Sequence, residues 1–374
     1  MHNSGGVAEA RRRAPADATS TRRGAMKGES SLLLFLFFSS IYVLQVVADS
    51  EKKATKIHLI SWERVHVGTG RIDHELMSID LPSHNLVYTQ SSPLPMKQGA
   101  RRKRVIYGTD DRVRIDPATQ GSTSPYNAVV RVSTGCSGIL ISPKHVLAAS
   151  HCVHNGNNYL LSARLFLRVG YLESDGRTKW SFVSKFYVPG QWRNHTRAGR
   201  HKYQNWADFD FSVLELSEEL GHTRGYVKPG LSGLFCNKRH PTSLHGTGSE
   251  IKFVSFPDDK PKTAMWLVTT KIETETSHLL YFKGDAWHGS SGAALYTWEG
   301  SERIVIGALS GNRQTEPEAR IQGTFNVAAR LDALDFLMIC KWIGTERECR
   351  ERYPNYLRKD RLESVLCHQR NLQM

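Results

Sequence analysis

The chain of 374 residues lacks the features that mark several large classes of protein. It has no internal repeat, and no long amphipathic helical stretch before its last part, so it is not a coiled coil. Its 30 Gly and 14 Pro are too few for a collagen-like chain. RNA- and DNA-binding motifs are missing, so we expect no nucleic acid as a partner. With 40% hydrophobic residues it can bury a core without a metal or cofactor, and we expect neither.

Acidic residues are fewer than basic ones, and the imbalance is greatest at the N-terminal end of the chain. The formal net charge is +14, and the first 104 residues hold 16 Lys/Arg against 9 Asp/Glu, which is half of that excess. The remainder of the chain is only mildly basic. Such a balance suits a weak contact with an anionic matrix or another polyanion.

Long hydrophobic runs are scarce, and the main one lies near the start. Residues 32–48 (LLLFLFFSSIYVLQVVA) follow Lys27 and end in small residues, which is the pattern of a secretory signal peptide. A short membrane anchor is the alternative, but the run is marginal for spanning, so we expect no stable membrane insertion. Either Met26 is the true start, or the leader is unusually long. We therefore predict that residues 1–48 are an N-terminal extension with a signal peptide, and that the protein is secreted.

A second processing signal is the basic run Arg101-Arg102-Lys103-Arg104, followed by Val105. It comes after a polar stretch rich in Ser and Pro, and secretory-pathway convertases cut after such runs. A plain solvated charge run is the alternative. We predict cleavage between Arg104 and Val105 by a furin-like convertase, which makes residues 49–104 a propeptide.

From Val105 onward, short runs of branched and aromatic residues alternate with turns. Apolar residues at helical spacing predict one late helix over residues 331–343. This order indicates an all-β barrel or sandwich over residues 105–349. Residues 350–374 are charged, and we expect this tail to pack poorly.

Three local segments carry chemistry, in the order His, Asp, Ser. In the first, an apolar strand ends in small residues before His151. In the second, Asp210 opens an apolar strand and can hold a histidine tautomer, with Asp208 as its competitor. In the third, glycines surround Ser291, so the backbone N–H groups of Gly289 and Ser291 can form an oxyanion hole. Ser290 is the rival nucleophile, but its spacing to the glycines is wrong.

These segments resemble the chymotrypsin-like serine peptidases: AASHC is similar to TAAHC, DFSVLEL to DIALLKL, and GSSG to GDSG. The RRKR–VIYG junction and a late CKWIGTEREC point to a secreted group within that family. The resemblance covers roughly residues 101–350. It implies two antiparallel six-stranded β-barrels with a C-terminal helix, and a cleft between the barrels. It also implies a secreted serine endopeptidase that hydrolyses protein or peptide substrates.

The resemblance assigns roles residue by residue. His151 is the general base and then the general acid, Asp210 orients it, and Ser291 attacks the scissile carbonyl. Ser310 and Gly311 match the segment that pairs with substrate backbone. Asp285 stands where trypsin-like enzymes hold a carboxylate for basic side chains, although Trp287 and His288 can fill that pocket. The preference for a substrate side chain is therefore left open.

Two departures from the family pattern favour an alternative, a catalytically weak or inactive binding protein on a peptidase fold. Ser290 replaces the Asp that pairs with the freed N-terminus in typical members. The usual disulfide beside the nucleophile is missing, because no cysteine lies between Cys236 and Cys340.

The six cysteines all follow the signal sequence, which suggests up to three disulfides in an oxidising compartment. We predict the pairs Cys136–Cys152 and Cys340–Cys349, which leave Cys236 with Cys367, although sequence alone does not settle the last four. The Asn194-His195-Thr196 triplet is a glycosylation acceptor.

Overall fold

The computed structural model describes residues 43–45, 56–81, 106–197, 207–236, 241–314 and 323–357. The chain divides into units Met1–Phe38 and Ser39–Met374, and every described residue belongs to the second unit. The predicted signal sequence up to residue 42, the cleavage junction at Arg104 and Val105, and Cys367 lie outside the described residues.

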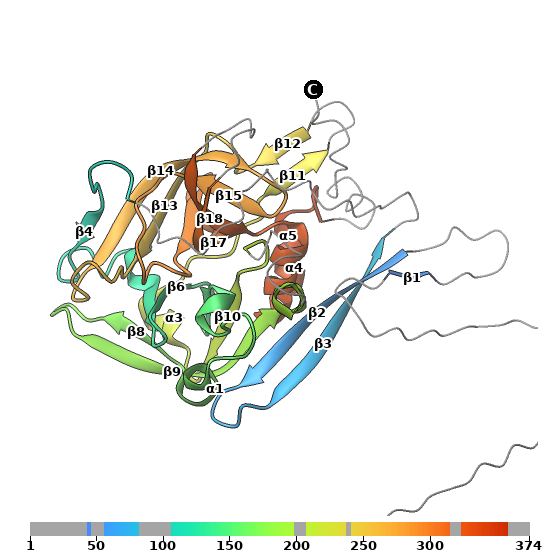
Figure 1. Ribbon diagram of the computed structural model, residues 1–374, viewed down its shortest axis with the longest axis horizontal. Helices are drawn as coiled ribbons and strands as arrows, with labels where there is room; N and C mark the ends of the chain where they lie inside the picture. The colour runs from blue at the N-terminus through green and yellow to red at the C-terminus, as the bar shows by residue number, and fades with distance from the viewer. Residues whose placement is uncertain are drawn as a thin grey trace, which may run out of the picture. The chain divides into compact units, whose positions relative to one another are not determined.

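The first barrel is a closed antiparallel ring (Figure 1). Each strand pairs with the next in the order β5-β6-β7-β10-β9-β8, and β8 returns to β5. Branched and aromatic side chains fill these strands, as their preference for a pleated, half-buried surface predicts. The six strands are β5 (Val129–Val132), β6 (Cys136–Leu140), β7 (His145–Ala148), β8 (Arg168–Leu172), β9 (Thr178–Pro189) and β10 (Ser212–Leu216).

The second barrel closes in the same way, in the order β13-β16-β17-β18-β15-β14 and back to β13. A short strand, β4 (Val113–Ile115), adds to its outside by pairing with β14. The six strands are β13 (Glu250–Ser255), β14 (Met265–Glu275), β15 (Leu279–Phe282), β16 (Ala294–Glu299), β17 (Glu302–Gln314) and β18 (Thr324–Arg330). The prediction of two six-stranded antiparallel barrels is therefore confirmed.

The apolar core has a part inside the second barrel and a larger part that both barrels share. The second barrel encloses a separate cluster that includes Phe253, Phe282 and Leu295. The larger cluster fills the first barrel, with Leu214, continues into the second barrel at Tyr296, and extends outward to Trp342 of the C-terminal helix. The barrels are linked by a segment that carries α3 (Leu220–Arg224) and the hairpin β11 (Gly233–Cys236) and β12 (Pro241–Leu244).

The predicted late helix is present as α4 (Ala333–Trp342), and Asp332 caps it by accepting from the amides of Leu334 and Asp335. A further helix, α5 (Glu346–Arg352), follows it. Tyr353 and Leu357 are buried against Phe336, so the expectation of a poorly packed tail from residue 350 is wrong as far as residue 357. The charged side chains lie on α5, while the apolar residues after it face the core.

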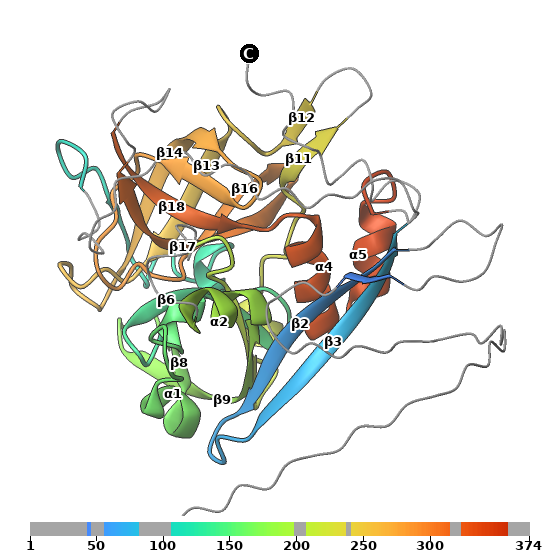
Figure 2. The ribbon, with the colours of Figure 1, turned by 45° about the vertical axis from the view of Figure 1, so that its right-hand side comes forward.

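An N-terminal hairpin extends the first barrel's sheet (Figure 2). It consists of β2 (Lys56–His66) and β3 (Ile72–Leu81), with β2 paired to β9 and β3 paired to β2. A three-residue strand, β1 (Val43–Gln45), also pairs with β2. Residues 56–81 of the predicted propeptide thus form a regular hairpin, which the sequence patterns did not reveal.

Short helices complete the described part of the chain. They are η1 (Tyr126–Ala128), η2 (Ser150–Cys152), α1 (Leu161–Phe166) and α2 (Gly190–Arg197). Among the described helices, none has the length and apolar character needed to cross a bilayer.

Candidate active site

His151 lies in η2, a single 3₁₀ turn directly after β7. The chain leaves the strand through Ala149, whose backbone is still extended, and Cys152 then donates its amide to the Ala149 carbonyl. The hydroxyl of Ser150 donates to the carbonyl of Phe211 at 2.5 Å, which ties the turn to the start of β10. The disulfide Cys136–Cys152 fixes the other side of the turn to β6. The imidazole therefore stands on a turn that is held at three points.

Asp210 precedes β10 and is fully buried beneath this turn. Its Oδ1 accepts the backbone amide of His151 at 2.9 Å, and its Oδ2 lies 2.7 Å from His151 Nδ1. The hydroxyl of Ser310, in β17 of the second barrel, also donates to Oδ2. Burial opposes ionisation of this carboxyl, but the charge of His151 and the hydrogen bonds from His151 and Ser310 outweigh it, so the pKa of Asp210 is lowered.

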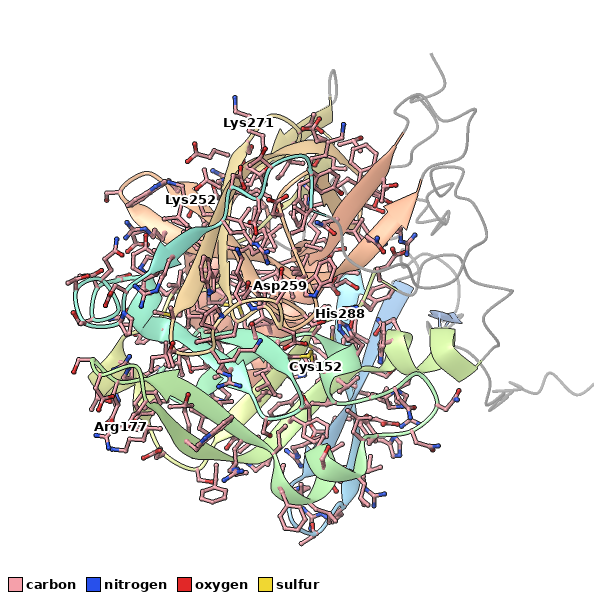
Figure 3. The ribbon with its side chains drawn as sticks, turned by 60° about the vertical axis from the view of Figure 1, so that its left-hand side comes forward. Cys152, Arg177, Lys252, Asp259, Lys271 and His288 are labelled. Atoms are coloured by element: carbon pink, nitrogen blue, oxygen red, sulfur yellow. A yellow bond between two sulfur atoms is a disulfide. The ribbon has the colours of Figure 1, made fainter. Side chains whose placement is uncertain are left out.

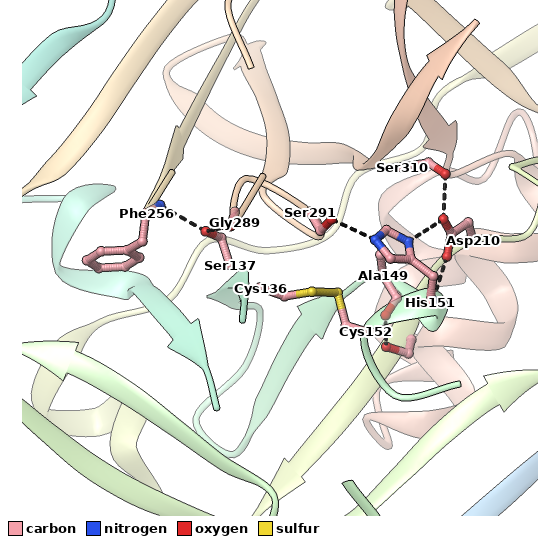
Figure 4. Close-up of a disulfide and its surroundings, with 11 residues drawn as sticks. Cys136, Ser137, Ala149, His151, Cys152, Asp210, Phe256, Gly289, Ser291 and Ser310 are labelled. Atoms are coloured by element: carbon pink, nitrogen blue, oxygen red, sulfur yellow. Dashed lines mark hydrogen bonds and ion pairs between the residues drawn. A yellow bond between two sulfur atoms is a disulfide. The ribbon is translucent and has the colours of Figure 1, made fainter. Parts of the chain in front are cut away.

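Ser291 reaches His151 from the second barrel (Figure 4). Its Oγ lies 2.6 Å from His151 Nε2, within hydrogen-bond range of a proton transfer. When Nδ1–H donates to Asp210, Nε2 has a lone pair directed at the serine hydroxyl, which is the tautomer a general base needs. The structure thus brings together His151, Asp210 and Ser291, the three residues that the sequence motifs predicted.

The backbone before Ser291 is shaped by Gly289. Gly289 has φ +87°, and a Cβ there would lie 2.4 Å from the Phe256 carbonyl oxygen, so only glycine fits. The carbonyl of the preceding His288 accepts the Asp258 amide at 2.6 Å. Because carbonyl and N–H point in opposite directions across a trans peptide, the Gly289 N–H points away from Asp258. The role of Gly289 and Ser291 as an oxyanion hole stays a prediction that this geometry supports.

The two rival residues have other surroundings. The Ser290 hydroxyl is fully buried and lies 3.0 Å from the hydroxyl of Ser255. Asp208 is also buried, and its charge acts on His278 and Asp335. The hydrogen bonds described above join His151 to Asp210 and Ser291.

Asp285, predicted as a substrate-binding carboxylate, lies buried beneath the segment that follows the cleavage junction. Its Oδ1 accepts the amide of Tyr107 at 2.7 Å, and its Oδ2 accepts the amide of Asp111 at 3.1 Å. The Tyr107 hydroxyl donates to the Thr324 carbonyl at 3.0 Å, at the start of β18. Both carboxylate oxygens are therefore engaged by this chain's own backbone, a contact that no motif signalled.

The other residues predicted to bind substrate, Ser310 and Gly311, lie in β17. Gly311 pairs with Val327, after an irregularity in register that follows Leu309. The Asn326 side-chain amide donates to the Gly284 carbonyl at 2.7 Å, which joins β18 to the segment leading to Ser291. Trp287 is half-buried and His288 is exposed. In Figure 3, His288 of the second barrel and Cys152 of the first lie near the boundary between the barrels.

Ser137, which the sequence reasoning passed over, joins the two barrels beside the nucleophile. Its amide donates to the Ser291 carbonyl at 2.7 Å, and its hydroxyl donates to the Gly289 carbonyl at 2.8 Å. The same hydroxyl accepts the Phe256 amide at 2.9 Å. Its only signal in the sequence was its place next to Cys136, in the stretch GCSG.

The disulfides Cys136–Cys152 and Cys340–Cys349 are both present, as expected. The side chains of Asn194 and Cys236 lie outside the described residues, so glycosylation and the third pairing stay predictions.

Among the described residues, two groups of side chains have the composition of metal ligands. Cys136, His151 and Cys152 form one, but both sulfurs are committed to the disulfide. His278, Asp332 and Asp335 form the other, and here Asp332 bonds to His278 Nδ1 at 2.8 Å. Burial and the neighbouring carboxylates raise the pKa of Asp335 well above its usual value.

Comparison with known proteins agrees with the two-barrel fold. The family model described as Trypsin matches residues 112–334. Serine protease 23 of Bos taurus is 33% identical over 278 residues, covering 67% of this chain and 69% of that protein. Inactive serine protease 35 of Bos taurus is 30% identical over 332 residues, covering 72% of this chain and 74% of that protein.

A solved structure, "Structure of Glu endopeptidase in complex with MPD", aligns with a TM-score of 0.47 at 22% identity, covering 64% of this chain and 100% of that chain. The family model and the curated relatives carry the assignment: this chain belongs to the trypsin family of serine proteases.

Proposed function

We propose that this protein is a secreted serine endopeptidase that cuts peptide bonds through an acyl-enzyme on Ser291. The observation that carries the proposal is the continuous line of contacts from Asp210 Oδ2 through His151 to Ser291 Oγ, at 2.7 and 2.6 Å. Secretion rests on the predicted signal peptide and on two disulfides, which persist in oxidising compartments.

The reaction follows from these contacts. Ser291 Oγ attacks the scissile carbonyl while its proton passes to His151 Nε2, and Asp210 stabilises the resulting imidazolium. The negative oxygen of the tetrahedral intermediate is held by the N–H groups of Gly289 and Ser291. His151 then gives the proton to the leaving amine, which departs and leaves the acyl group on Ser291. A water molecule, deprotonated by His151, attacks the acyl carbonyl. The bond to Ser291 Oγ then breaks as His151 returns the proton to Oγ, which releases the acid and restores the free serine.

The contacts of Asp285 bear on which substrate side chain is preferred at the cut site. A free carboxylate at Asp285 would favour basic side chains, but both of its oxygens accept backbone amides of the chain itself. This arrangement weakens the case for a trypsin-like preference, so we propose that specificity does not depend on an ion pair with Asp285. The expected readout is cleavage of peptide libraries with no excess of Lys or Arg at the cut site.

The experiment that tests the proposal is labelling of the processed protein with a fluorophosphonate, which reacts with an activated serine. Wild-type protein should be labelled, and Ser291→Ala should abolish the labelling. The matched control is Ser290→Ala, which removes the neighbouring hydroxyl that bonds to Ser255, and it should still be labelled. Peptide mapping should place the label on residue 291.

The competing function is a non-catalytic binding protein on the same fold. A relative named inactive serine protease 35, and Ser290 in place of the usual activating Asp, favour it. N-terminal sequencing first verifies the cleavage at Arg104. If the cleaved protein is then not labelled, the result contradicts the enzyme and supports the binding protein.

A further inference from the structure

The N-terminal hairpin, residues 56–81, is built into the first barrel's sheet. Five residues of β2, Trp62 to His66, pair with β9 in antiparallel register, from Trp62 opposite Pro189 to His66 opposite Lys185. Two further backbone bonds continue the contact, from Val67 N–H to the Ser184 carbonyl and from Gly68 N–H to the Arg164 carbonyl. The hairpin therefore supplies β9 with main-chain partners along the edge that it covers.

The buried Glu63 of the hairpin lies against charged groups of the peptidase domain and of the hairpin's other strand. Glu63 is 6% exposed, and its Oε2 accepts from the Arg193 guanidinium and from the Tyr159 hydroxyl, the latter at 2.6 Å. Arg193 also lies over the Tyr159 ring, 5.4 Å from its centre. Removing Glu63 would leave the Arg193 charge in a buried place without its carboxylate, which is strongly unfavourable.

Apolar side chains of the hairpin complete the contact. Trp62 and Val65 are buried in the first barrel's cluster, and the Trp62 ring meets Trp342 of α4 edge-on at 6.1 Å. The backbones also approach closely, because a Cβ on Gly190 would lie 2.9 Å from the Ser61 carbonyl oxygen. Backbone, charge and apolar surface of the hairpin thus all fit one site on the peptidase domain.

The segment that contains the hairpin has no covalent link of its own to that domain. Residues 49–104 include no cysteine, so a cut at the basic run Arg101–Arg104 leaves no disulfide across it. A two-stranded hairpin alone is marginally stable in water, so this one depends on β9 for its structure.

We propose that cleavage at the basic run does not release this segment: it stays on β9 as a non-covalent second chain that completes the first barrel's sheet. The segment is then a permanent subunit of the mature protein rather than a propeptide that departs. The proposal concerns binding alone, so it stands or falls separately from the catalytic activity of Ser291.

The test replaces residues 101–104 with the recognition sequence of a site-specific protease, so that the cut does not depend on the cell's own enzyme. After complete cutting, the two chains should co-elute from a size-exclusion column in physiological buffer at micromolar concentration. They should separate in 6 M guanidinium without any reductant. Separate elution in physiological buffer would overturn the proposal.

Two variants with the same new side chain test whether the buried face of the hairpin holds the segment in place. Val65→Asp places a charge at a fully buried position of the hairpin, and Leu76→Asp places it at a position that is 63% exposed. We expect the Val65→Asp segment to dissociate on the order of 100-fold faster after cutting, because an unpaired charge would be buried. Leu76→Asp should behave as wild type. Equal behaviour of the two variants would contradict the docking described here.

A measurement on the unsubstituted hairpin covers the case in which Val65→Asp fails to fold. Hydrogen exchange of the backbone amides in β9 that face β2, around Val188, should remain as slow after cutting as before it. Loss of that protection upon cutting, with the rest of the first barrel unchanged, would show that the segment leaves, and would reject the proposal.

Discussion

Asp210 receives hydrogen bonds from both barrels. His151 reaches it twice from the first barrel, and Ser310 reaches it from the second. A buried carboxylate that must stay ionised needs such donors, because desolvation would otherwise favour its neutral form. The hydroxyl of Ser310 thus helps to keep Asp210 ionised and so to hold His151. This role is separate from any contact of the Ser310 backbone with substrate.

We predict that Ser310→Ala slows fluorophosphonate labelling about tenfold, since a hydrogen bond to a charged group contributes about 1.5–3 kcal/mol. The labelling rate should also fall at the acidic end of its pH range, because the pKa of Asp210 rises toward its usual value. Ser310→Thr keeps a hydroxyl and should recover part of the rate. Identical rates for Ser310→Ala and wild type would show that this bond does not position the pair.

The lowered pKa of His145 predicts how the free energy of unfolding depends on pH. Burial lowers its pKa from 6.5 to about 4, while its Nδ1 lies 2.7 Å from the Ser142 hydroxyl. Between these values the unfolded chain binds the proton more readily, so the free energy of unfolding falls as pH drops from 6.5 toward 4. The loss is about 3 kcal/mol at most.

The check is urea unfolding across that pH window, with His145→Gln as the variant that cannot titrate. The difference in unfolding free energy between wild type and variant should shrink as the pH falls. A difference that is constant with pH would contradict the lowered pKa.

The residues of the site were predictable because their signals are local. A histidine before a cysteine, an acid before an apolar strand and a serine among glycines each occupy a few consecutive positions, and His151, Asp210 and Ser291 came from such patterns. Ser137 and the partners of Asp285 were not predictable, because their roles depend on contacts between segments more than 100 positions apart.

At the scale of elements, the turn η2 depends on the disulfide Cys136–Cys152, whose ends are 16 positions apart. We predict that Cys136→Ser with Cys152→Ser lowers the free energy of unfolding by about 3 kcal/mol, as loop closure of this length implies. Fluorophosphonate labelling should also weaken, because His151 lies next to Cys152.

The matched control is Cys340→Ser with Cys349→Ser, which opens a loop of similar size, 9 positions, between α4 and α5. It should cost a similar amount of stability and leave labelling of the folded protein unchanged. Equal losses of labelling in both double variants would mean that the effect comes from general destabilisation.

Several strands were predictable from runs of branched and apolar residues, and the late helix from its spacing, to within two residues of the α4 bounds. The run from Arg164 to Val169 was also expected to be a strand, and this was wrong for its first part, which ends the helix α1. The hairpin of β2 and β3 was missed, because Lys, Glu, Arg, His and Asp interrupt its apolar residues. These charged side chains are paired within the fold: Arg64 meets Asp73 and Glu75, and Glu63 meets Arg193. A pattern that counts only hydrophobic residues cannot detect such pairs.

At the scale of the whole molecule, Ser137 makes one of the contacts between the barrels. Ser137→Ala removes the acceptor of the buried Phe256 amide and the donor to the Gly289 carbonyl. We predict a loss of stability of about 1–3 kcal/mol and slower labelling, because the backbone beside Ser291 loses its anchor. Unchanged labelling would indicate that Gly289 is held by its own barrel.

Ser184→Ala is the matched control, since its hydroxyl donates to the Glu215 carbonyl at 3.0 Å within the first barrel. Calorimetry should show that it is destabilised, while its labelling rate per folded molecule stays at the wild-type value.

The division of the triad between the barrels has a mechanical consequence. His151 and Asp210 come from the first barrel and Ser291 from the second, so a displacement of about an ångström between the barrels would separate nucleophile from base while the strands stayed paired. Catalytic activity would then be lost without unfolding, and it would return once the barrels were again in contact.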